Sequence, residues 1–101
     1  MVYTPDGDEV PFDWDEQNAA HVERHSATPD EVTQALLSGD RLFLRRSDTE
    51  TEDRWVVMGP TDEGRWLVVV YTRRNGQIRV ITAREPNARE AAFLSRRRRK
   101  K

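Results

Sequence analysis

The sequence of 101 residues predicts one α+β domain: an antiparallel sheet of about four strands, with two helices before it and one after it. The prediction rests first on residues 54–84, where three apolar segments separated by turn residues indicate consecutive antiparallel strands. It rests second on helix-start signals, which occur before residue 40 and after residue 85. We therefore expect a meander of strands with helices packed against it.

The middle strand of this meander, Arg65–Tyr71, is apolar on both faces. Alternation along it gives two apolar sets, Trp66, Val68 and Val70 on one side and Leu67, Val69 and Tyr71 on the other. A strand of this kind is buried on both faces, so elements must pack above and below it. Asn75-Gly76 predicts a type I′ hairpin turn after it, and residues 61–64, after Pro60, predict the turn before it.

The first helix is expected to run from Asp15 to about His25, because Asp15 can cap it and acidic residues occupy its first turn. Before it, residues 10–14 alternate between apolar and other residues, which suggests a short strand that Pro11 confines to a sheet edge. Residues 1–9 form an acidic extension that we expect to be flexible.

The second helix has the clearest start. Thr28 is the expected N-cap, Pro29 occupies the first helical position, where its missing N–H costs nothing, and Glu31 completes a capping box. The residues expected on its buried stripe are Val32, Ala35 and Leu36. Gly39 is expected to end it.

The remaining segments complete the domain. Leu42–Arg46 predicts a further short strand, followed by a polar loop over residues 47–53 that we expect to be mobile. Pro86 and Asn87 predict the start of the last helix, which ends in six consecutive cations, Arg96–Lys101. Their mutual repulsion should fray the helix end. No internal repeat or long linker divides the chain, so we expect a single domain over residues 1–101.

The net charge of −1 hides a strong asymmetry along the chain. Residues 1–31 contain nine acids and one arginine, whereas residues 84–101 contain eight bases and two acids. The polarity suggests a basic surface for a polyanion or an acidic partner, unless the two ends fold near each other and cancel. The chain has no cysteine, no apolar run near the roughly 20 residues of a membrane span and no signal-peptide pattern. A cytoplasmic protein is the expectation.

His21 and His25 lie four residues apart and hence on one helical face. Two histidines at this spacing can ligate zinc, but Val22 stands where the metalloprotease motif has glutamate, and no third ligand is evident. We therefore expect no metal. His25 fits a cap at the helix end, and either histidine can act as a general acid or base.

Seven arginines lie on or beside the meander: Arg54, Arg65, Arg73, Arg74, Arg79, Arg84 and Arg89. Strand alternation predicts that Arg79 shares a face with Ile81 and Ala83, where an arginine can either bind phosphate or pair with a carboxylate. Arg73 and Arg74 flank the hairpin tip and are expected on the surface. The basic tail can contact nucleic acid electrostatically. The three tryptophans, Trp14, Trp55 and Trp66, can stack bases, but we expect them in the core.

An ordered set of motifs resembles the BrnT toxin family. The set comprises Trp14–His25, Thr28–Val32, Arg54-Trp55, Gly59, Gly64-Arg65, Leu67–Tyr71, Ile78–Ile81, Ala83-Arg84 and Arg89-Glu90 with Phe93. The resemblance covers about residues 12–95. It departs from the family at Ser26-Ala27, where Gly-Val is usual, and at Phe93, where many members have tyrosine.

The resemblance implies a RelE-like domain that acts as a metal-independent endoribonuclease without a cofactor and is neutralised by a ribbon-helix-helix antitoxin. It implies catalysis by Arg79 and Arg84, which would stabilise charge on phosphorus, and proton transfer by His21 or His25. The arginines that would bind the RNA backbone are Arg89, Arg65, Arg73 and Arg74. The departures motivate an alternative, a non-catalytic domain of the same fold that binds protein or nucleic acid.

Overall fold

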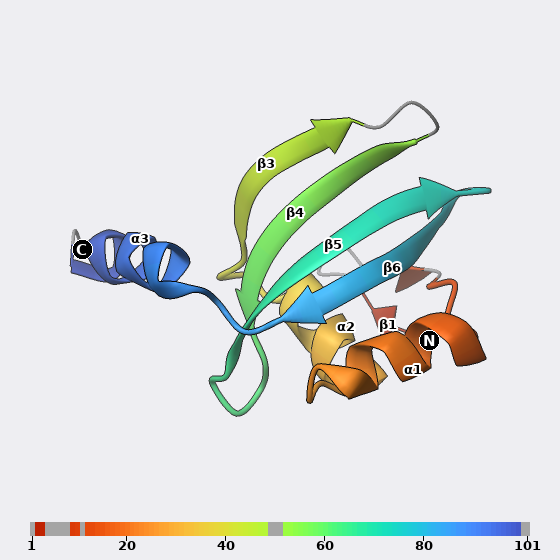
Figure 1. The fold of residues 1–101 in the computed structure, drawn as a ribbon, viewed down its shortest axis with the longest axis horizontal. Coiled ribbons are helices and arrows are strands. Elements are labelled where there is room, and N and C mark those ends of the chain that lie inside the picture. Colours follow the sequence, from red (N-terminus) through yellow and green to blue (C-terminus); the bar gives the residue numbers. More distant parts are fainter. Residues whose placement is uncertain (1, 4–8, 11, 49–51, 100–101) are drawn as a thin grey trace.

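The computed structural model describes residues 2–3, 9–10, 12–48 and 52–99, and Figure 1 shows their arrangement. The elements in chain order are β1 (Val2–Tyr3), β2 (Glu9–Val10), α1 (Glu16–Arg24), α2 (Pro29–Leu37), β3 (Leu42–Asp48), β4 (Asp53–Pro60), β5 (Trp66–Arg74), β6 (Gln77–Arg84) and α3 (Ala88–Arg99). Strands β3 to β6 form one antiparallel meander in chain order. The predicted α+β class, with about four strands in the sheet, is confirmed.

Both predicted turns of the meander are present. Asn75 and Gly76 have φ values of 54° and 76°, the two positive values that a type I′ turn requires. In the turn between β4 and β5, Gly64 has φ 87° and its N–H donates to the carbonyl of Thr61 at 2.9 Å. Because both turns are tight, β5 lies directly between β4 and β6.

Helices α1 and α2 cover one face of the sheet. The core on this side is Val22, Ala27, Val32, Ala35, Leu36, Val57, Leu67, Val69, Val80 and Ala83. The predicted stripe of α2 is therefore confirmed. Gly59 explains how closely α2 approaches β4, because a Cβ added to Gly59 would lie 2.1 Å from the carbonyl oxygen of Ala35. Only a residue without a side chain fits there.

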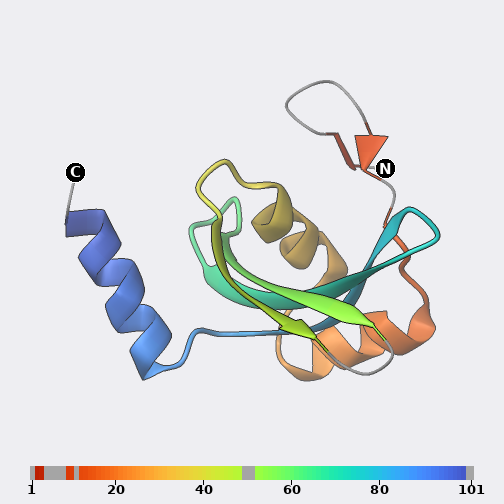
Figure 2. The same cartoon turned by 90° about the horizontal axis from the view of Figure 1, so that it is seen from above.

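The opposite face carries a second, smaller core. Val56, Met58 and Val68 are buried there, and the side chains packed on them are Leu42, Leu44, Trp66, Val70, Phe93 and Leu94. The last two belong to α3, which otherwise stands beyond the end of β6 and away from the α1–α2 layer (Figures 1 and 2). Since β5 contributes to both cores, its predicted burial on both faces is confirmed.

The helix ends follow the predicted caps with one exception. Asp15 caps α1, His25 is its C-cap, and Thr28 with Glu31 forms the capping box of α2. The prediction that Gly39 ends α2 is wrong. The helix ends at Leu37 because Ser38 is already extended, at φ −62° and ψ 137°, so no glycine in a left-handed conformation is needed.

Two strand predictions are also wrong. The described residues of the 10–14 segment do not share one strand: Val10 pairs with β1, and Phe12 makes an isolated parallel bridge to Ile78 of β6. On β6, a bulge shifts the register, so that Tyr71 pairs with Val80 but Val70 pairs with Thr82. Ala83 therefore joins the core beside Val80 instead of sharing a face with Arg79.

Two of the three tryptophans pack against a core, and the third is half-buried outside both. Trp14 packs against the first core and Trp66 against the second, as predicted, but Trp55 belongs to neither. The predicted flexible extension, mobile loop and basic tail lie partly outside the described residues, namely at 1, 4–8, 49–51 and 100–101. Within the described part of the chain, no helix is long and apolar enough to cross a membrane.

Candidate functional site

Helix α1 is attached to the edge strand β6 by Asn18. The buried Asn18 amide Nδ2 donates to the carbonyls of Asp13, at 2.9 Å, and Val80, at 3.2 Å, while its Oδ1 accepts from the N–H of Asp15 at 2.8 Å. A buried amide with these partners satisfied holds the helix in one position. The position of the next turn of α1 relative to β6 is therefore fixed.

His21 lies on α1 about one turn after Asn18. Its Nε2 lies 3.1 Å from the hydroxyl oxygen of Thr82 on β6, and its Nδ1 lies 3.5 Å from Nη2 of Arg24. Because arginine can only donate, Nδ1 accepts in this contact, which leaves the proton on Nε2 to donate to Thr82. His25 has a different position: it is the exposed C-cap of α1, and its ring centroid lies 5.2 Å from that of His21. His21 is thus the histidine that contacts the sheet.

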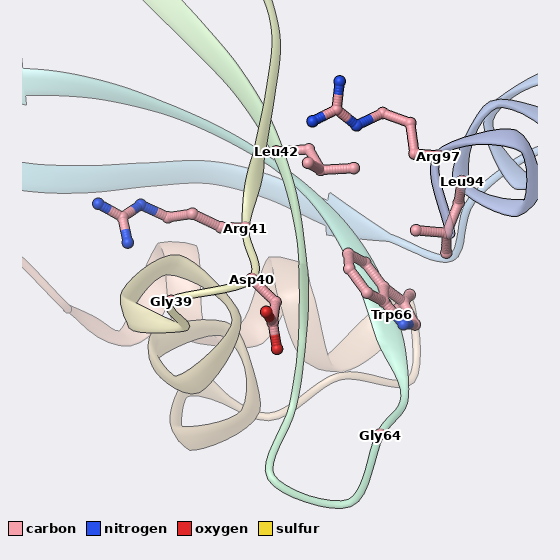
Figure 3. A pocket seen from close by; sticks show the side chains of 8 residues that line it. All are labelled: Gly39, Asp40, Arg41, Leu42, Gly64, Trp66, Leu94 and Arg97. Atoms are coloured by element: carbon pink, nitrogen blue, oxygen red, sulfur yellow. The ribbon is translucent and has the colours of Figure 1, made fainter. Parts of the chain in front are cut away.

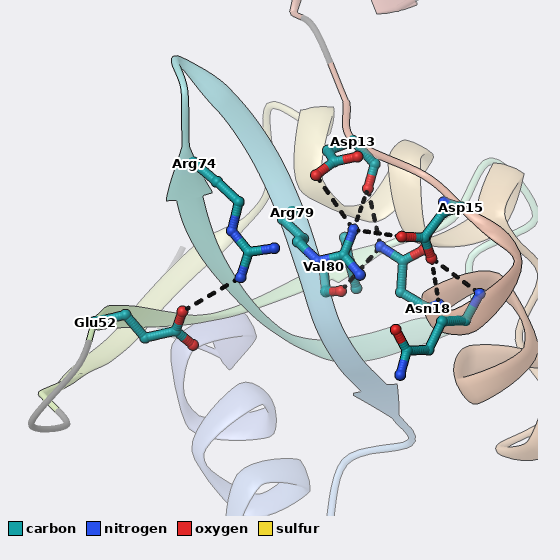
Figure 4. Close-up of polar contacts among 8 residues, drawn as sticks. Asp13, Asp15, Asn18, Glu52, Arg74, Arg79 and Val80 are labelled. Atoms are coloured by element: carbon teal, nitrogen blue, oxygen red, sulfur yellow. Dashed lines mark hydrogen bonds and ion pairs between the residues drawn. The ribbon is translucent and has the colours of Figure 1, made fainter.

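Arg79 is held by two carboxylates (Figure 4). Its Nη1 lies 2.9 Å from Oδ2 of Asp15 and 3.2 Å from Oδ2 of Asp13, and the side chain is only 12% exposed. The hydrogen bond with Asp15 raises the pKa of Arg79. The backbone N–H of Asn18, and then Arg79, lower the pKa of Asp15. The three charged groups sum to −1, so this end of β6 does not attract a phosphate.

Arg84, at the other end of β6, forms a two-point ion pair with Glu90 of α3. The distances are 2.6 Å from Nη1 to Oε1 and 2.9 Å from Nη2 to Oε2, and 37% of the arginine side chain stays exposed. Arg84, ahead of every other cause, lowers the pKa of Glu90, and Arg45 of β3 adds to the effect. Glu90 is thus paired with Arg84 and lies in the field of a second arginine.

Thr82 and Arg84 bring these observations together. They pair in regular register with Val70 and Val68, so they lie on the same face of β6, about 7 Å apart along the strand. His21 contacts Thr82 from α1. We call His21, Thr82 and Arg84 the β6-edge site. The site thus combines a proton-transfer group, in contact with Thr82, and a partly exposed cation two residues further along β6.

The other predicted residues lie elsewhere. Arg65 donates to the carbonyl of Ser26 at 2.6 Å and pairs with Glu31 and Glu85, so it joins the ends of α1 and β6 to α2. Arg74 lies 3.9 Å from a carboxylate oxygen of Glu52 (Figure 4). Arg73 is exposed near the hairpin tip, as predicted, and Arg89 is exposed on α3. The structure brings none of these four into contact with His21 in any interaction described.

A groove on the α3 side of the molecule does not include the β6-edge site. It has a volume of about 590 Å³ and lies between the starts of β3 and β5 and helix α3 (Figure 3). Its lining residues are Gly39, Asp40, Arg41, Leu42, Gly64, Trp66, Leu94 and Arg97. Figure 3 shows the Trp66 ring near Leu94 and Leu42, and Arg41 directed to the other side of β3. Phe93 lies in the second core, with the Arg97 guanidinium 5.9 Å from its ring centroid.

The candidate site needed partners that the sequence did not reveal. Thr82 and Arg45 carry no motif, and their roles follow only from the register of β6 with β5 and of β3 with β4. Asp13 and Asp15 were visible as acids, but nothing in the sequence connected them to Arg79, about 65 residues later. Within the residues that the structure covers, no three histidine, cysteine, aspartate or glutamate side chains form a group that could hold a metal ion.

Comparison with known proteins gives one family. A family model described as "Ribonuclease toxin, BrnT, of type II toxin-antitoxin system" matches residues 14–90, which include both helices on the first face and the whole sheet. No protein of curated function matches the chain. The matched region contains the entire β6-edge site and its partner Glu90.

Proposed function

The chain belongs to the BrnT family of ribonuclease toxins of type II toxin–antitoxin systems, and from this premise we propose that it cleaves RNA internally without a metal ion. The chemistry is attack by a ribose 2′-hydroxyl on the adjacent phosphorus. The bond from O2′ to phosphorus forms and the bond from phosphorus to O5′ breaks, while one proton leaves O2′ and one reaches O5′. The reaction needs a proton-transfer group and a cation for the charge that develops on the phosphate oxygens.

His21 is proposed as the proton-transfer group. Its imidazole lies at the edge of the sheet, where it is half-buried, and its Nε2–H now donates to Thr82. A substrate oxygen that takes the place of Thr82 would receive the proton from the same nitrogen. The contact between His21 and Thr82, two residues from Arg84, is the observation that carries the assignment.

Arg84 is proposed as the cation that stabilises the transition state. A guanidinium has five N–H donors; the pair with Glu90 and the contact with the Glu85 carbonyl, at 3.3 Å, use three of them, which leaves two for a phosphate. Arg45 adds positive charge on the same side. Arg79 is proposed as a positioning residue, because it joins Asp13 and Asp15 at the start of α1 and thereby holds the helix that carries His21. The exposed Arg89 and the basic tail are proposed to guide the RNA backbone.

The test is cleavage of a short RNA by the purified protein and its variants. His21→Ala should lower kcat by about 10²- to 10⁴-fold, the usual contribution of a general acid or base. His25→Ala, one turn away at the exposed helix end, should retain activity, and EDTA should leave the wild type unchanged. Thermal melts of each variant confirm folding. Equal activity of His21→Ala and wild type would remove His21 from the mechanism, and loss in His25→Ala alone would transfer the role to His25.

A non-catalytic domain of the same fold is the second candidate. The enclosure of Arg79 by two carboxylates favours it, because a cation neutralised in this way is not offered to a phosphate. Expression in cells separates the two candidates. The toxin should arrest growth and fragment RNA, and an Arg79→Ala/Arg84→Ala variant should do neither. Equal growth and intact RNA with both proteins would establish the second candidate.

Membership of the family implies an antitoxin partner. We propose that this partner has a ribbon-helix-helix DNA-binding region and that the toxin acts on RNA in the cytoplasm. Co-expression of a short neighbouring reading frame of that type should restore growth and the two proteins should co-purify. A neighbouring frame that neither binds the chain nor restores growth would contradict this pairing.

A further inference from the structure

An aromatic surface borders the first core, against which one of its members, Tyr71, packs. Phe43 on β3 has 60% of its surface exposed and is, within the described residues, the large apolar side chain that stands out as exposed. Trp55 on β4 belongs to neither core, and its ring stacks on that of Tyr71 on β5, with centroids 5.7 Å apart and planes inclined by 21°. We call Phe43, Trp55 and Tyr71 the aromatic platform.

Strand register places the platform on one face. Trp55 pairs with Tyr71, and Phe43 pairs with Val57, which lies two residues after Trp55 on β4. All three therefore face the side on which α1 and α2 pack. Helix α2 contacts β4 at its far end, at Gly59, so the part of the sheet around Trp55 and Phe43 extends beyond the helices. A groove of about 360 Å³ joins Phe43 and Tyr71 to the chain that leaves α2.

The rim of the platform is positively charged. The guanidinium of Arg46 lies 5.8 Å from the centroid of the Trp55 ring, and Arg41 lines the groove. Arg73 follows Tyr71 by two residues on β5, so it lies on the same face, and it is exposed. Asp53 pairs with Arg46 and offsets one of these three charges. Flat rings with arginines around them match the bases and phosphates of a nucleic acid strand.

We propose that the aromatic platform binds single-stranded RNA, with bases stacked on Phe43 and on the Trp55–Tyr71 pair and phosphates beside the arginine rim. The proposal rests on the proposed function, because the RNA bound by the platform would be part of the substrate of the ribonuclease. The platform extends over β3 to β5, and β3 and β6 are separated by three strand spacings, about 14 Å in all. The platform faces α1 and α2, whereas Thr82 and Arg84 pair with Val70 and Val68 of the opposite core, so a strand that occupies the platform passes around the edge of the sheet before it reaches Arg84.

Stacking explains this surface better than protein docking does. Protein docking on Phe43 would depend on apolar area, and the three rings offer little of it, because only Phe43 is largely exposed. A base needs only one open ring face, and every base has such a face. The positively charged rim attracts phosphates, whereas an uncharged protein surface would gain nothing from these charges.

The test uses a fluorescein-labelled 2′-O-methyl RNA octamer, which cannot be cleaved by 2′-hydroxyl attack, and measures binding by anisotropy. Phe43→Ala and Phe43→Leu should both weaken binding, by about 5- to 100-fold, because each removes the ring. Phe43→Trp should bind at least as tightly as the wild type. Phe43→Leu is the matched control for apolar area, and the exposure of Phe43 predicts that all three variants melt like the wild type. An octamer without bases should bind weakly and equally to all of them.

Two outcomes would overturn the proposal. In the first, Phe43→Leu binds like the wild type while Phe43→Ala is weakened, which would assign the surface to apolar packing, as in protein docking. In the second, the wild type does not bind the octamer or all variants bind it equally. Cleavage of unmodified RNA is measured on the same proteins, so that failure of the platform, with cleavage retained, is distinguished from failure of the ribonuclease itself.

Discussion

Replacing Ser26 by glycine should stabilise this protein. Ser26 follows the C-cap of α1 and has φ 66°, in the left-handed region. It is held there because its own N–H donates to the carbonyl of Glu23, and the N–H of Ala27 donates to the carbonyl of Val22, both at 3.1 Å. These bonds close the end of the helix. They require a conformation that costs an L-residue about 1–2 kcal/mol and costs glycine nothing.

The expected gain follows from two opposing effects. Glycine removes the left-handed strain but loses about 0.5–1 kcal/mol more backbone entropy on folding. The difference between these ranges is about 0–1.5 kcal/mol, and we expect a net stabilisation near its middle, about 0.5–1 kcal/mol. At an unfolding entropy of about 2.1 cal/mol/K per residue, a chain of 101 residues should melt roughly 2–5 °C higher. Activity per folded molecule should not change, because Ser26 is exposed and its contacts with Glu23 and Arg65 are made by the backbone, which glycine keeps.

The assay is thermal unfolding followed by circular dichroism at constant pH and protein concentration. Ser38→Gly is the matched control, because Ser38 also ends a helix but has φ −62°, where glycine relieves nothing. The control variant should melt at a lower temperature than the wild type. If Ser26→Gly melts no higher than the wild type, or if both variants gain equally, strain at Ser26 is not the cause.

Two further predictions concern the sheet and α3. Gly59→Ala should lower the urea midpoint by the equivalent of about 1–3 kcal/mol, because the added methyl would meet the backbone of Ala35. Gly39→Ala is the control: no atom lies within 4 Å of the added carbon, so the midpoint should stay nearly unchanged. Equal effects of the two substitutions would contradict this account. Glu90→Gln should destabilise the protein at pH 7 but not in acid. The pKa of Glu90 is lowered in the folded state, so its ion pair with Arg84 contributes stability above the unfolded pKa and loses it as pH falls from about 4 through the folded pKa. Denaturation of both proteins between pH 7 and pH 2 measures this, and a difference that persists unchanged in acid would refute it.

Local signals in the sequence were sufficient for most of the fold. The alternation in β5, the Asn75-Gly76 turn and the capping boxes of the helices each depend on residues a few positions apart, which a sequence displays directly. Alternation failed on β6, where one bulged residue reverses which side chains face the core. A bulge is a property of two paired strands, so one strand's sequence does not reveal it.

The candidate site was only partly predictable for the same reason. The sequence indicated His21, His25, Arg79 and Arg84 as chemical groups, and the structure adds the contacts that distinguish them. His21 touches the sheet and His25 ends a helix. Arg79 is enclosed by acids that lie about 65 positions earlier, which no spacing rule anticipates.

By itself, then, the sequence determined the order of the elements, the two-sided burial of β5, the turns, the helix caps and the resemblance to a toxin family, because all of these depend on local pattern or ordered motifs. Tertiary structure alone decided which histidine meets β6, which arginine remains partly exposed, and that Trp55 and Phe43 lie outside both cores. Alternation tells which face of a strand a side chain occupies. How far a short helix such as α2 extends over that face depends on packing between distant segments, here the contact between Ala35 and Gly59.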